Sequence, residues 1–488
     1  MGKALWLKSI KIASVAFALA ASFLFGRMVT TGKLVADAKN LLALPALGLI
    51  LLSLSNWRWG IYGLLIYIPF AGVVTLHLHP WTLPLLFKDI FFLLPAYLSF
   101  AAYKLRKREA ITFPGAPIWP MVCFAAIVVI YLLNPGFGSL AHGLVGVKVW
   151  LSYIPLYYVI YHLIDNKKTF YRLIWILNVL SIISVIIGII QEILVIYGKT
   201  DILLSYYLKY YYEIPQNIFG IVGPSKSDIF VRVPSTFTAP AQFFWFLFSN
   251  MHIAVALANV EKGKWRVLCW MNLALLIAAQ FSCGTRAAYL FTPLALLAIY
   301  LFRQKIIGLA KVSISMGVLI PITLLIIGGS FQGRMAHVLD LAYKYLLGTS
   351  VGLFTSAVER VTPLGLGTGI ATNPARYISP EPLVPMENYY GKVWVELGLP
   401  GLLIVLWLFA SLVIKGYQAH KRLYDPDLKW FSVSILVYLV MVVTTQSKGF
   451  TLDIEPVNVY FWMFAGMLMK LPYLQEGEPK ANENPPLP

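Results

Sequence analysis

The composition of this 488-residue chain is typical of a protein embedded in lipid, since 59% of its residues are hydrophobic and only 12% are charged. Together with a mean hydropathy of +0.75, these values exclude a soluble multidomain protein. The formal net charge of +18 does not indicate a nucleic-acid partner, because the Lys and Arg residues stand in short clusters between apolar runs, as in the cytoplasmic loops of membrane proteins.

The cysteines give no sign of a disulfide framework or a metal site. Cys123, Cys269 and Cys283 are isolated in the sequence and show neither CxxC nor Cys/His spacing. We therefore expect neither thiolate-bound metal nor redox chemistry.

The chain begins with a basic segment and an apolar run. Lys3, Lys8 and Lys11 precede the apolar residues 12–26, a pattern typical of a signal peptide or of a first transmembrane span. We interpret the run as an uncleaved span, because the alternation of basic loops along the chain requires it.

Apolar runs continue as far as the C-terminal region. They cover approximately residues 40–55, 59–77, 83–103, 117–133, 141–163, 171–198, 239–260, 265–281, 286–302, 307–329, 388–415, 429–446 and 452–470. Most of them reach the length of about 20 residues that crosses the ~30 Å hydrocarbon core of a bilayer. The sequence therefore predicts an all-α, polytopic integral membrane protein with about 12–14 transmembrane helices.

Alternate loops between these runs carry the basic residues, which predicts that these loops are cytoplasmic. The residues are Lys104, Arg106, Lys107 and Arg108; Lys167, Lys168 and Arg172; Lys262, Lys264 and Arg266; Arg303, Lys305 and Lys311; and Lys415, Lys421, Arg422 and Lys429. Arg27, Lys33 and Lys39 are exceptions, which this topology places outside. By the same alternation both chain ends are cytoplasmic and both long loops are extracytoplasmic.

The chain is accordingly expected to have six parts. They are an N-terminal transmembrane bundle (1–198), an extracytoplasmic loop (199–238), transmembrane helices (239–329), a large extracytoplasmic loop (330–386), C-terminal transmembrane helices (387–470) and a polar, Pro-rich cytoplasmic tail (471–488) that we expect to be disordered. No internal repeat is visible, which argues against inverted-repeat transporters.

Several charged residues lie at or near membrane depth, where each needs a partner or a role. Asp89, next to Lys88, fits an ion pair with a neighbouring helix. Lys148, in GLVGVKVW, is too deep to reach the lipid headgroups easily. We interpret it either as lining a pocket or as a member of a buried pair.

Arginines recur on the predicted outer side. Arg232 leads into PSTFTAPAQFFWF, and Arg286, in FSCGTRAAYL, precedes another apolar run. Two arginines at one membrane level suit a phosphate or a diphosphate, because each guanidinium offers paired donors and a permanent charge. Binding of lipid headgroups or of helix-end carbonyls is the alternative. Arg334, in FQGRMAHVLDLAYKYL, is a further candidate.

A Gly-rich loop precedes the apolar run predicted at 388–415. Gly365, Gly367 and Gly369 in PLGLGTG permit tight turns and a close approach of backbone N–H groups to a ligand. No strand is predicted before the loop and no Lys-Ser/Thr follows it, so it is not a nucleotide-binding fingerprint.

The helix predicted after this loop contains two glutamates. It should begin at residues 386–388 and continue to Ile414. Glu396 shares a face with Lys392 at i−4, which indicates a structural role. Glu387 lacks such a partner and stands at the helix start, where it either complements the helix dipole or takes part in catalysis.

The motifs of the second half of the chain, taken together, resemble a known family. Arg232 with PSTFTAPAQF, TRA at the start of a span, PLGLGTG and ENYYGKVWVELGLPGLL follow one another in an order and spacing similar to those of the O-antigen ligase and polymerase family of bacterial envelope glycosyltransferases. The resemblance covers about residues 230–415. Earlier in the chain only the hydropathy and the region around Lys148 are similar.

The resemblance implies transfer of a glycan from an undecaprenyl-diphosphate donor to an acceptor hydroxyl, on the outer face of the bacterial cytoplasmic membrane, without metal, nucleotide or other cofactor. It implies that Arg232 and Arg286, and also Arg334, bind the diphosphate of the donor. Glu387 is expected to take the proton from the attacking hydroxyl.

The expected pocket wall comprises Lys148, Gly367, Asn388 and Tyr389. Ligases that act on the lipid A core usually show His-Asn where this chain has Glu387-Asn388, so the chain looks more like polymerases of exopolysaccharide or of cell-wall polysaccharide such as teichuronic acid. Expected partners are the lipid-linked oligosaccharide, membrane lipids, a flippase and a chain-length regulator. The alternatives are a ligase of finished polymer and a flippase or exporter of the lipid-linked glycan.

Overall fold

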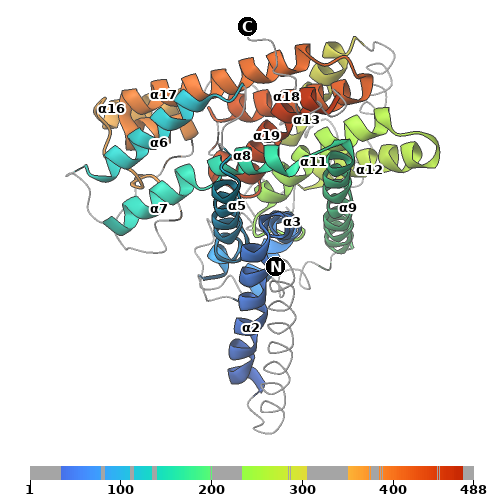
Figure 1. Ribbon diagram of the computed structural model, residues 1–488, viewed down its shortest axis with the longest axis horizontal. Helices are drawn as coiled ribbons and strands as arrows, with labels where there is room; N and C mark the ends of the chain where they lie inside the picture. Colours follow the sequence, from blue (N-terminus) through green and yellow to red (C-terminus); the bar gives the residue numbers. More distant parts are fainter. Residues whose placement is uncertain are drawn as a thin grey trace. The chain divides into compact units, whose positions relative to one another are not determined.

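The computed structural model describes residues 34–78, 83–109, 115–134, 140–197, 199, 233–283, 285, 287–304, 350–372, 374, 384, 386, 388–447, 449 and 451–475. Every regular element in these ranges is a helix, which confirms the expected all-α class (Figure 1). In the same ranges seven helical stretches are long and apolar enough to cross a membrane: Trp57–His77, Leu83–Lys107, Leu140–Leu163, Lys167–Leu194, Pro240–Val260, Tyr389–Lys421 and Pro426–Thr445.

The chain divides into two compact units, and the smaller one comprises residues 1–68 and 83–111. Its described helices are α2 (Leu34–Ser55), α3 (Trp57–Tyr67), the π-helix η3 (Asp89–Leu93) and α5 (Leu94–Lys107). Gly60 lets α3 and α5 approach closely, because a Cβ there would lie 2.8 Å from the Cβ of Ala96. Asp89 forms an ion pair at 3.4 Å with Lys88, the residue before it.

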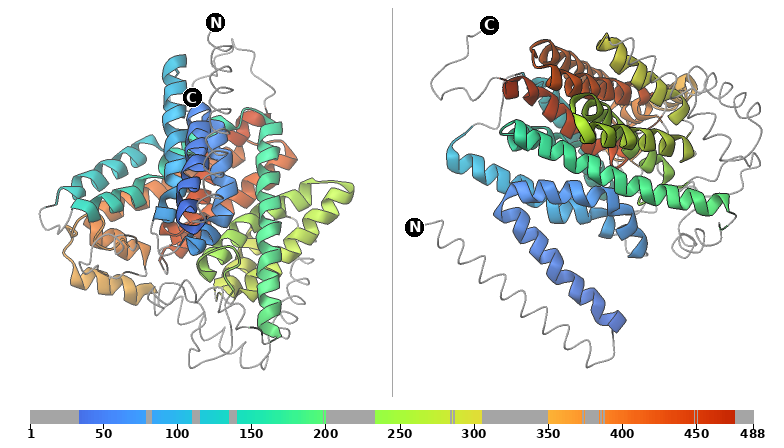
Figure 2. Two further views of the ribbon diagram at one scale, coloured as in Figure 1. Left: turned by 90° about the horizontal axis from the view of Figure 1, so that it is seen from below. Right: turned by 90° about the vertical axis from the view of Figure 1, so that its right-hand side faces the viewer.

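The larger unit comprises residues 69–82 and 112–488. Its described helices are α4 (Ala71–His77), α6 (Ile118–Leu132), α7 (Leu140–Leu151), α8 (Ile154–Leu163), α9 (Lys167–Ile196), α11 (Pro240–Val260), α12 (Gly263–Ser282), α13 (Ala287–Phe302), α16 (Ser350–Arg360), α17 (Tyr389–Lys421), α18 (Pro426–Thr445) and α19 (Val457–Gln475). α11 packs against α9, α12, α18 and α19 and is buried from Phe243 to Ala258. Figure 2 shows α17, α18 and α19, orange to red, stacked beside one another.

Basic residues gather at one end of the larger unit. Lys167 at the start of α9 forms an ion pair with Asp425, the N-cap residue of α18, with 2.6 Å between Nζ and Oδ2. Trp175 of α9 donates to Glu261, between α11 and α12, at 3.2 Å. These contacts bring together three basic clusters, around residues 167–172, 262–266 and 415–429.

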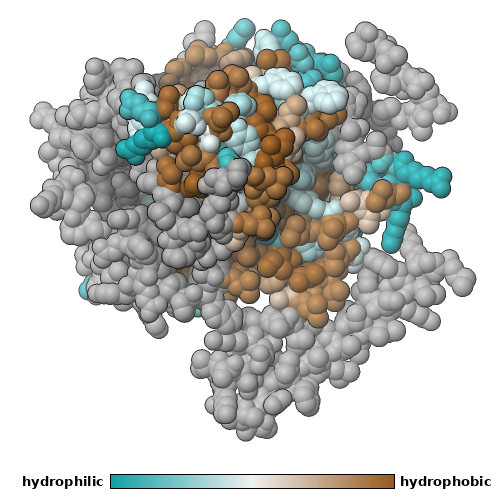
Figure 3. Space-filling model, turned by 90° about the vertical axis from the view of Figure 1, so that its left-hand side faces the viewer, coloured by the Kyte–Doolittle hydropathy of each residue, from teal (hydrophilic) through white to brown (hydrophobic). Residues whose placement is uncertain are grey.

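The outer surface of α9 carries an apolar stripe. Ile183, Ile186, Ile190 and Ile193 recur at helical spacing and are 40%, 49%, 52% and 45% exposed. Apolar side chains also cover much of the described surface in Figure 3. Such surfaces are unfavourable in water and suit contact with lipid, so the described helices fit a multi-pass membrane protein.

α17 is a hairpin of two arms. The sequence predicted one helix from residues 386–388 to Ile414, but the structure begins the helix at Tyr389 and turns it back at Gly398, where φ is +64° and ψ is −165°. Twenty residues of straight helix would span about 30 Å, yet the rings of Tyr389 and Phe409 lie 6.2 Å apart. We call residues 389–397 the first arm and residues 399–421 the second arm.

Candidate functional site

The Gly-rich segment, residues 363–372, forms a loop without regular structure, which we call the glycine loop. Its backbone follows the first arm of α17, because Leu366 N donates to Val395 O at 2.7 Å and Gly367 N donates to Glu396 O at 3.0 Å. Gly367 and Gly369 have φ values of +118° and +100°, which side chains rarely permit. Glycine therefore stands at the positions where the loop backbone takes a positive φ while it packs against the first arm of α17.

The glycine loop also closes the end of α6 and touches α7. Thr368 donates from its hydroxyl to Val128 O at 2.8 Å and from its N–H to Tyr131 O at 3.3 Å. Both carbonyls belong to the last turn and a half of α6, and that of Tyr131 is among the last four of the helix, which lack an i+4 partner within it. A Cβ at Gly369 would lie 2.2 Å from His142 O of α7, so only glycine fits between the loop and that helix.

The Glu396 carboxylate is the centre around which the glycine loop folds. Oε2 accepts from Gly369 N at 2.9 Å and from Trp150 Nε1 at 2.7 Å. Oε1 accepts from Ala371 N at 2.9 Å and from the Thr372 hydroxyl at 2.8 Å. A carboxylate has about four acceptor sites, and Glu396 is fully buried. Glu396 thus has a structural role, with all its acceptor sites in use.

Lys392 does not pair with Glu396, the partner that helical spacing had suggested. Its ammonium donates to Asp453 Oδ2 at 2.5 Å and lies 4.2 Å from the centre of the Trp150 ring. The two paired side chains are only 1% and 4% exposed. Burial raises the pKa of the Asp453 carboxyl, while the Lys392 ammonium opposes that rise and the Glu396 charge adds to it. The glycine loop, α7, α17 and the segment after α18 are thereby joined in one buried polar network.

The start of α17 is anchored by backbone and side-chain bonds. Asn388 is the N-cap: its Oδ1 accepts from Gly391 N at 2.9 Å, and its Nδ2 donates to Ser447 O at 2.5 Å. Tyr389 N donates to Gln446 O at 3.0 Å. The capping function is therefore performed by Asn388, one residue after Glu387 in the sequence.

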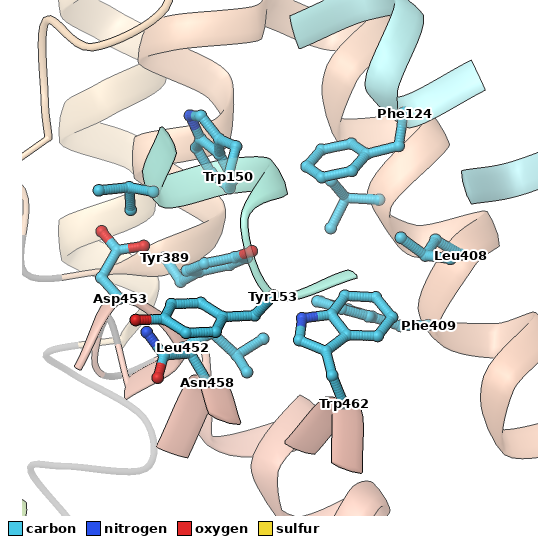
Figure 4. Close-up of a pocket in the computed structure, with 12 residues that line it drawn as sticks. Phe124, Trp150, Tyr153, Tyr389, Leu408, Phe409, Leu452, Asp453, Asn458 and Trp462 are labelled. Atoms are coloured by element: carbon cyan, nitrogen blue, oxygen red, sulfur yellow. The ribbon is translucent and has the colours of Figure 1, made fainter. Parts of the chain in front are cut away.

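A small cavity of about 20 Å³, enough for about one water molecule and partly open to the outside, lies beside this network. Its walls come from α6, α7, α17, α19 and the 3-10 turn Thr451–Asp453. The lining residues are Phe124, Val149, Trp150, Tyr153, Tyr389, Val405, Leu408, Phe409, Leu452, Asp453, Asn458 and Trp462 (Figure 4). The cavity is lined mainly by aromatic and aliphatic side chains, and its one carboxylate, that of Asp453, is already paired with Lys392.

The residues predicted for catalysis and for diphosphate binding, Glu387, Arg232, Arg286 and Arg334, lie outside the described residues.

The four residues predicted to line the pocket are described. Tyr389 is part of the pocket wall, Asn388 caps α17, and Gly367 is buried in the glycine loop. Lys148 is half-buried on α7, two residues before Trp150.

Sequence reasoning missed Trp150 and Asp453, the two residues that connect Glu396 and Lys392 to other helices. Asp453 could have been noticed as an acid at the predicted outer end of a span, and Trp150 as an indole two residues after the charged Lys148. Neither signal predicts a partner. Among the described residues, no group of three or more His, Cys, Asp or Glu side chains is arranged to hold a metal ion.

Comparison with known proteins adds no identification: no protein-family model matches this chain, and no curated protein matches it significantly.

Proposed function

We propose that this chain is an integral membrane glycosyltransferase that joins lipid-diphosphate-linked oligosaccharide repeat units into a polysaccharide at the outer face of the bacterial cytoplasmic membrane. In this proposal the donor carries undecaprenyl diphosphate, the chain crosses the membrane about 12–14 times, and residues 199–238 and 330–386 are extracytoplasmic. The observation that carries the proposal is the glycine loop, folded around Glu396 and joined to the first arm of α17. Such a frame supplies the fixed geometry on which substrate positioning depends.

Glu396, in α17, and Glu387, which precedes α17 in the sequence, have different roles in this proposal. Glu396 has four donors, so it holds the glycine loop and is not free to accept a proton from a substrate. Glu387 precedes Asn388, which already caps the helix. A second capping group is unnecessary there, which favours the catalytic role: Glu387 takes the proton from the attacking sugar hydroxyl, a poor nucleophile without such assistance.

Binding of the donor diphosphate is assigned to Arg232 and Arg286. In support, Ser235, three residues after Arg232, is held on α9 by two bonds to the Gln191 amide, at 2.7 Å and 3.0 Å. Arg286 stands between α12, which ends at Ser282, and α13, which begins at Ala287, and the Tyr289 hydroxyl joins the two helices by donating to the Phe281 carbonyl at 3.3 Å. Two guanidinium groups near one another would stabilise the charge that develops on the departing diphosphate.

The decisive experiment supplies the purified, reconstituted protein with a synthetic undecaprenyl-diphosphate repeat unit and separates the products by length. A ladder of lengthened products is expected. Transfer of finished polymer to a protein or wall acceptor without a ladder would instead indicate a ligase. Movement of the lipid-linked glycan across the vesicle membrane without any covalent change would indicate a flippase or exporter.

In the same assay the Glu387→Gln variant should lose about 10²–10⁴-fold in turnover, the usual contribution of a general base. Its melting temperature and its binding of the donor should stay close to those of the wild type. Glu359→Gln, at an exposed position of α16, is the matched control. If Glu387→Gln is active but less stable, Glu387 has a structural role and the base lies elsewhere.

A further inference from the structure

Glu192, near the end of α9, is a buried acid that the proposed mechanism does not use. It is 6% exposed, and its Oε2 has no hydrogen-bond partner among the residues that the structure describes. The acids Asp89, Glu396 and Asp453, which are also buried, all have partners: Lys88 for Asp89, four donors for Glu396 and Lys392 for Asp453. An unpaired carboxyl at such a position is costly and in membrane proteins generally marks a functional site.

The polar groups next to Glu192 on α9 are engaged elsewhere. Gln191 bonds both the N–H and the C=O of Ser235. Ser184 accepts from the Ser235 hydroxyl through its carbonyl at 2.6 Å, and its own hydroxyl lies 3.3 Å from that of Thr236. These contacts fix the turn before α11 on α9. They leave the free oxygen of Glu192 as an acceptor beside a rigid turn.

The direction of the helices places Glu192 at one end of the larger unit. α9 and α11 are antiparallel, because Trp175 near the start of α9 reaches Glu261 after α11, whereas Gln191 near its end reaches Ser235 before α11. α12 follows α11 through a short turn and therefore runs parallel to α9. Glu192 thus lies far from the end where the basic clusters gather.

A contact between α9 and α12 fixes the level more closely. Asn272 of α12 donates to Asn178 of α9 at 2.7 Å. Glu192 lies 14 residues beyond Asn178, or about 21 Å along a helix. Ser282, the last residue of α12, lies 10 residues beyond Asn272, or about 15 Å along the helix. Glu192 therefore lies near the level at which α12 ends.

The groups around Glu192 limit the kind of ligand that it can bind. A calcium or magnesium ion needs several oxygen ligands, but the neighbouring Ser184, Gln191 and Ser235 groups are already bonded to one another. A single buried carboxylate oxygen instead matches one hydrogen-bond donor, which a sugar hydroxyl supplies.

We propose that Glu192 binds the glycan substrate by accepting a hydrogen bond from one of its sugar hydroxyls. This inference rests on the proposed function, and it adds a sugar-binding residue near the end of α9, close to the level at which α12 ends. Glu192 acts in binding, whereas proton transfer is assigned to Glu387.

The first test uses the wild-type protein and therefore does not depend on a variant that folds. Purified full-length protein is treated with an apolar carbodiimide, which modifies carboxyls in apolar surroundings, and the label at residue 192 is quantified by peptide mass spectrometry. The undecaprenyl-diphosphate repeat unit should reduce labelling of Glu192, and undecaprenyl diphosphate without sugar should not. Equal labelling with and without the glycan, or no labelling of Glu192, would overturn the proposal.

The second test compares the kinetics of Glu192→Gln and Glu192→Ala with those of Glu261→Gln, a matched change at the opposite end of the unit. Loss of one hydrogen bond to a charged group should raise KM for the glycan about 10–100-fold, with kcat largely retained. Saturating the lipid-linked donor and the oligosaccharide acceptor separately shows which of them Glu192 contacts. An unchanged KM for both would refute the assignment.

The two proposals fail in different ways. If the wild type makes no ladder but the glycan still protects Glu192 from the carbodiimide, polymerisation is refuted and the sugar site is retained. If the ladder forms but Glu192 is neither protected nor needed for a normal KM, the proposed function stands and the sugar site is refuted.

Discussion

The Glu396 carboxylate receives hydrogen bonds from residues that lie between 24 and 246 positions away in the chain. Each donor is buried with it, and three of the four belong to the glycine loop. Because that loop has no regular structure of its own, its shape depends on these bonds and on its contacts with the first arm of α17. A structural carboxylate of this kind is sensitive to loss of charge, since a neutral substitute cannot accept all four donors.

Glu396→Gln should therefore destabilise the protein. The amide retains one acceptor oxygen, so about two buried donors lose their partner, at about 1–3 kcal/mol each. We expect a loss of about 2–6 kcal/mol in the free energy of unfolding, measured by equilibrium unfolding in mixed micelles. Glu359→Gln, exposed on α16, should leave stability unchanged. A Glu396→Gln variant as stable as the wild type would contradict the structural role.

At the scale of elements, the turn at Gly398 gives α17 its two arms. A Cβ at Gly398 would lie 2.3 Å from Pro363 O and 2.7 Å from Leu364 C, so the turn and the glycine loop exclude a side chain between them. A hydrogen bond from Leu399 N to Pro363 O, at 2.8 Å, also holds the turn against the glycine loop. The turn brings the start of α17 beside Phe409 and so helps to form the pocket.

Gly398→Ala should destabilise this hairpin by more than about 3 kcal/mol, since the backbone strain alone costs about 1–3 kcal/mol and the contact with Pro363 adds to it. Gly263→Ala is the matched control: its φ is +55°, but a Cβ there meets nothing within 4 Å. The control should cost only the strain of about 1–2 kcal/mol. Equal melting temperatures for the two variants would show that the contact with the glycine loop is unimportant.

At the scale of the whole molecule, the gathering of basic clusters at one end fixes which helix ends share a side of the membrane. Lys167 pairs with Asp425, and Trp175 pairs with Glu261, so the start of α9, the α11–α12 turn and the α17–α18 turn lie together. The positive-inside rule predicts that this end is cytoplasmic. The glycine loop and the start of α17 would then belong to the outer side, where a lipid-linked glycan is presented.

Cysteine accessibility in intact cells tests this topology. In a variant lacking the three native cysteines, new cysteines at Lys264 and Arg422 should react with a membrane-impermeant reagent only after the cells are opened. A cysteine at Lys199, just after α9, should react in intact cells. Labelling of position 264 or 422 from outside would reverse the assignment of sides and would remove the outer-face site from the proposed function.

The sequence by itself determined the class of the protein and most helix positions. The apolar runs predicted at 239–260 and 429–446 correspond to Pro240–Val260 and Pro426–Thr445. Such runs are local properties: about 20 apolar residues must form a helix in lipid, because unpaired backbone groups are too costly there. Glycines at tight approaches were also visible in PLGLGTG, since their requirement is local to each residue.

Only the tertiary structure decided which charged groups meet. Helical spacing offered Lys392 as the partner of Glu396, but the donors come from Trp150 and the glycine loop, and Lys392 turns to Asp453. Likewise nothing local distinguishes Glu192 from any other acid in an apolar run. Pairing in a membrane bundle depends on which helix ends come together, and the chain specifies this through contacts between residues as far apart as Trp150 and Glu396, which no short window of sequence contains.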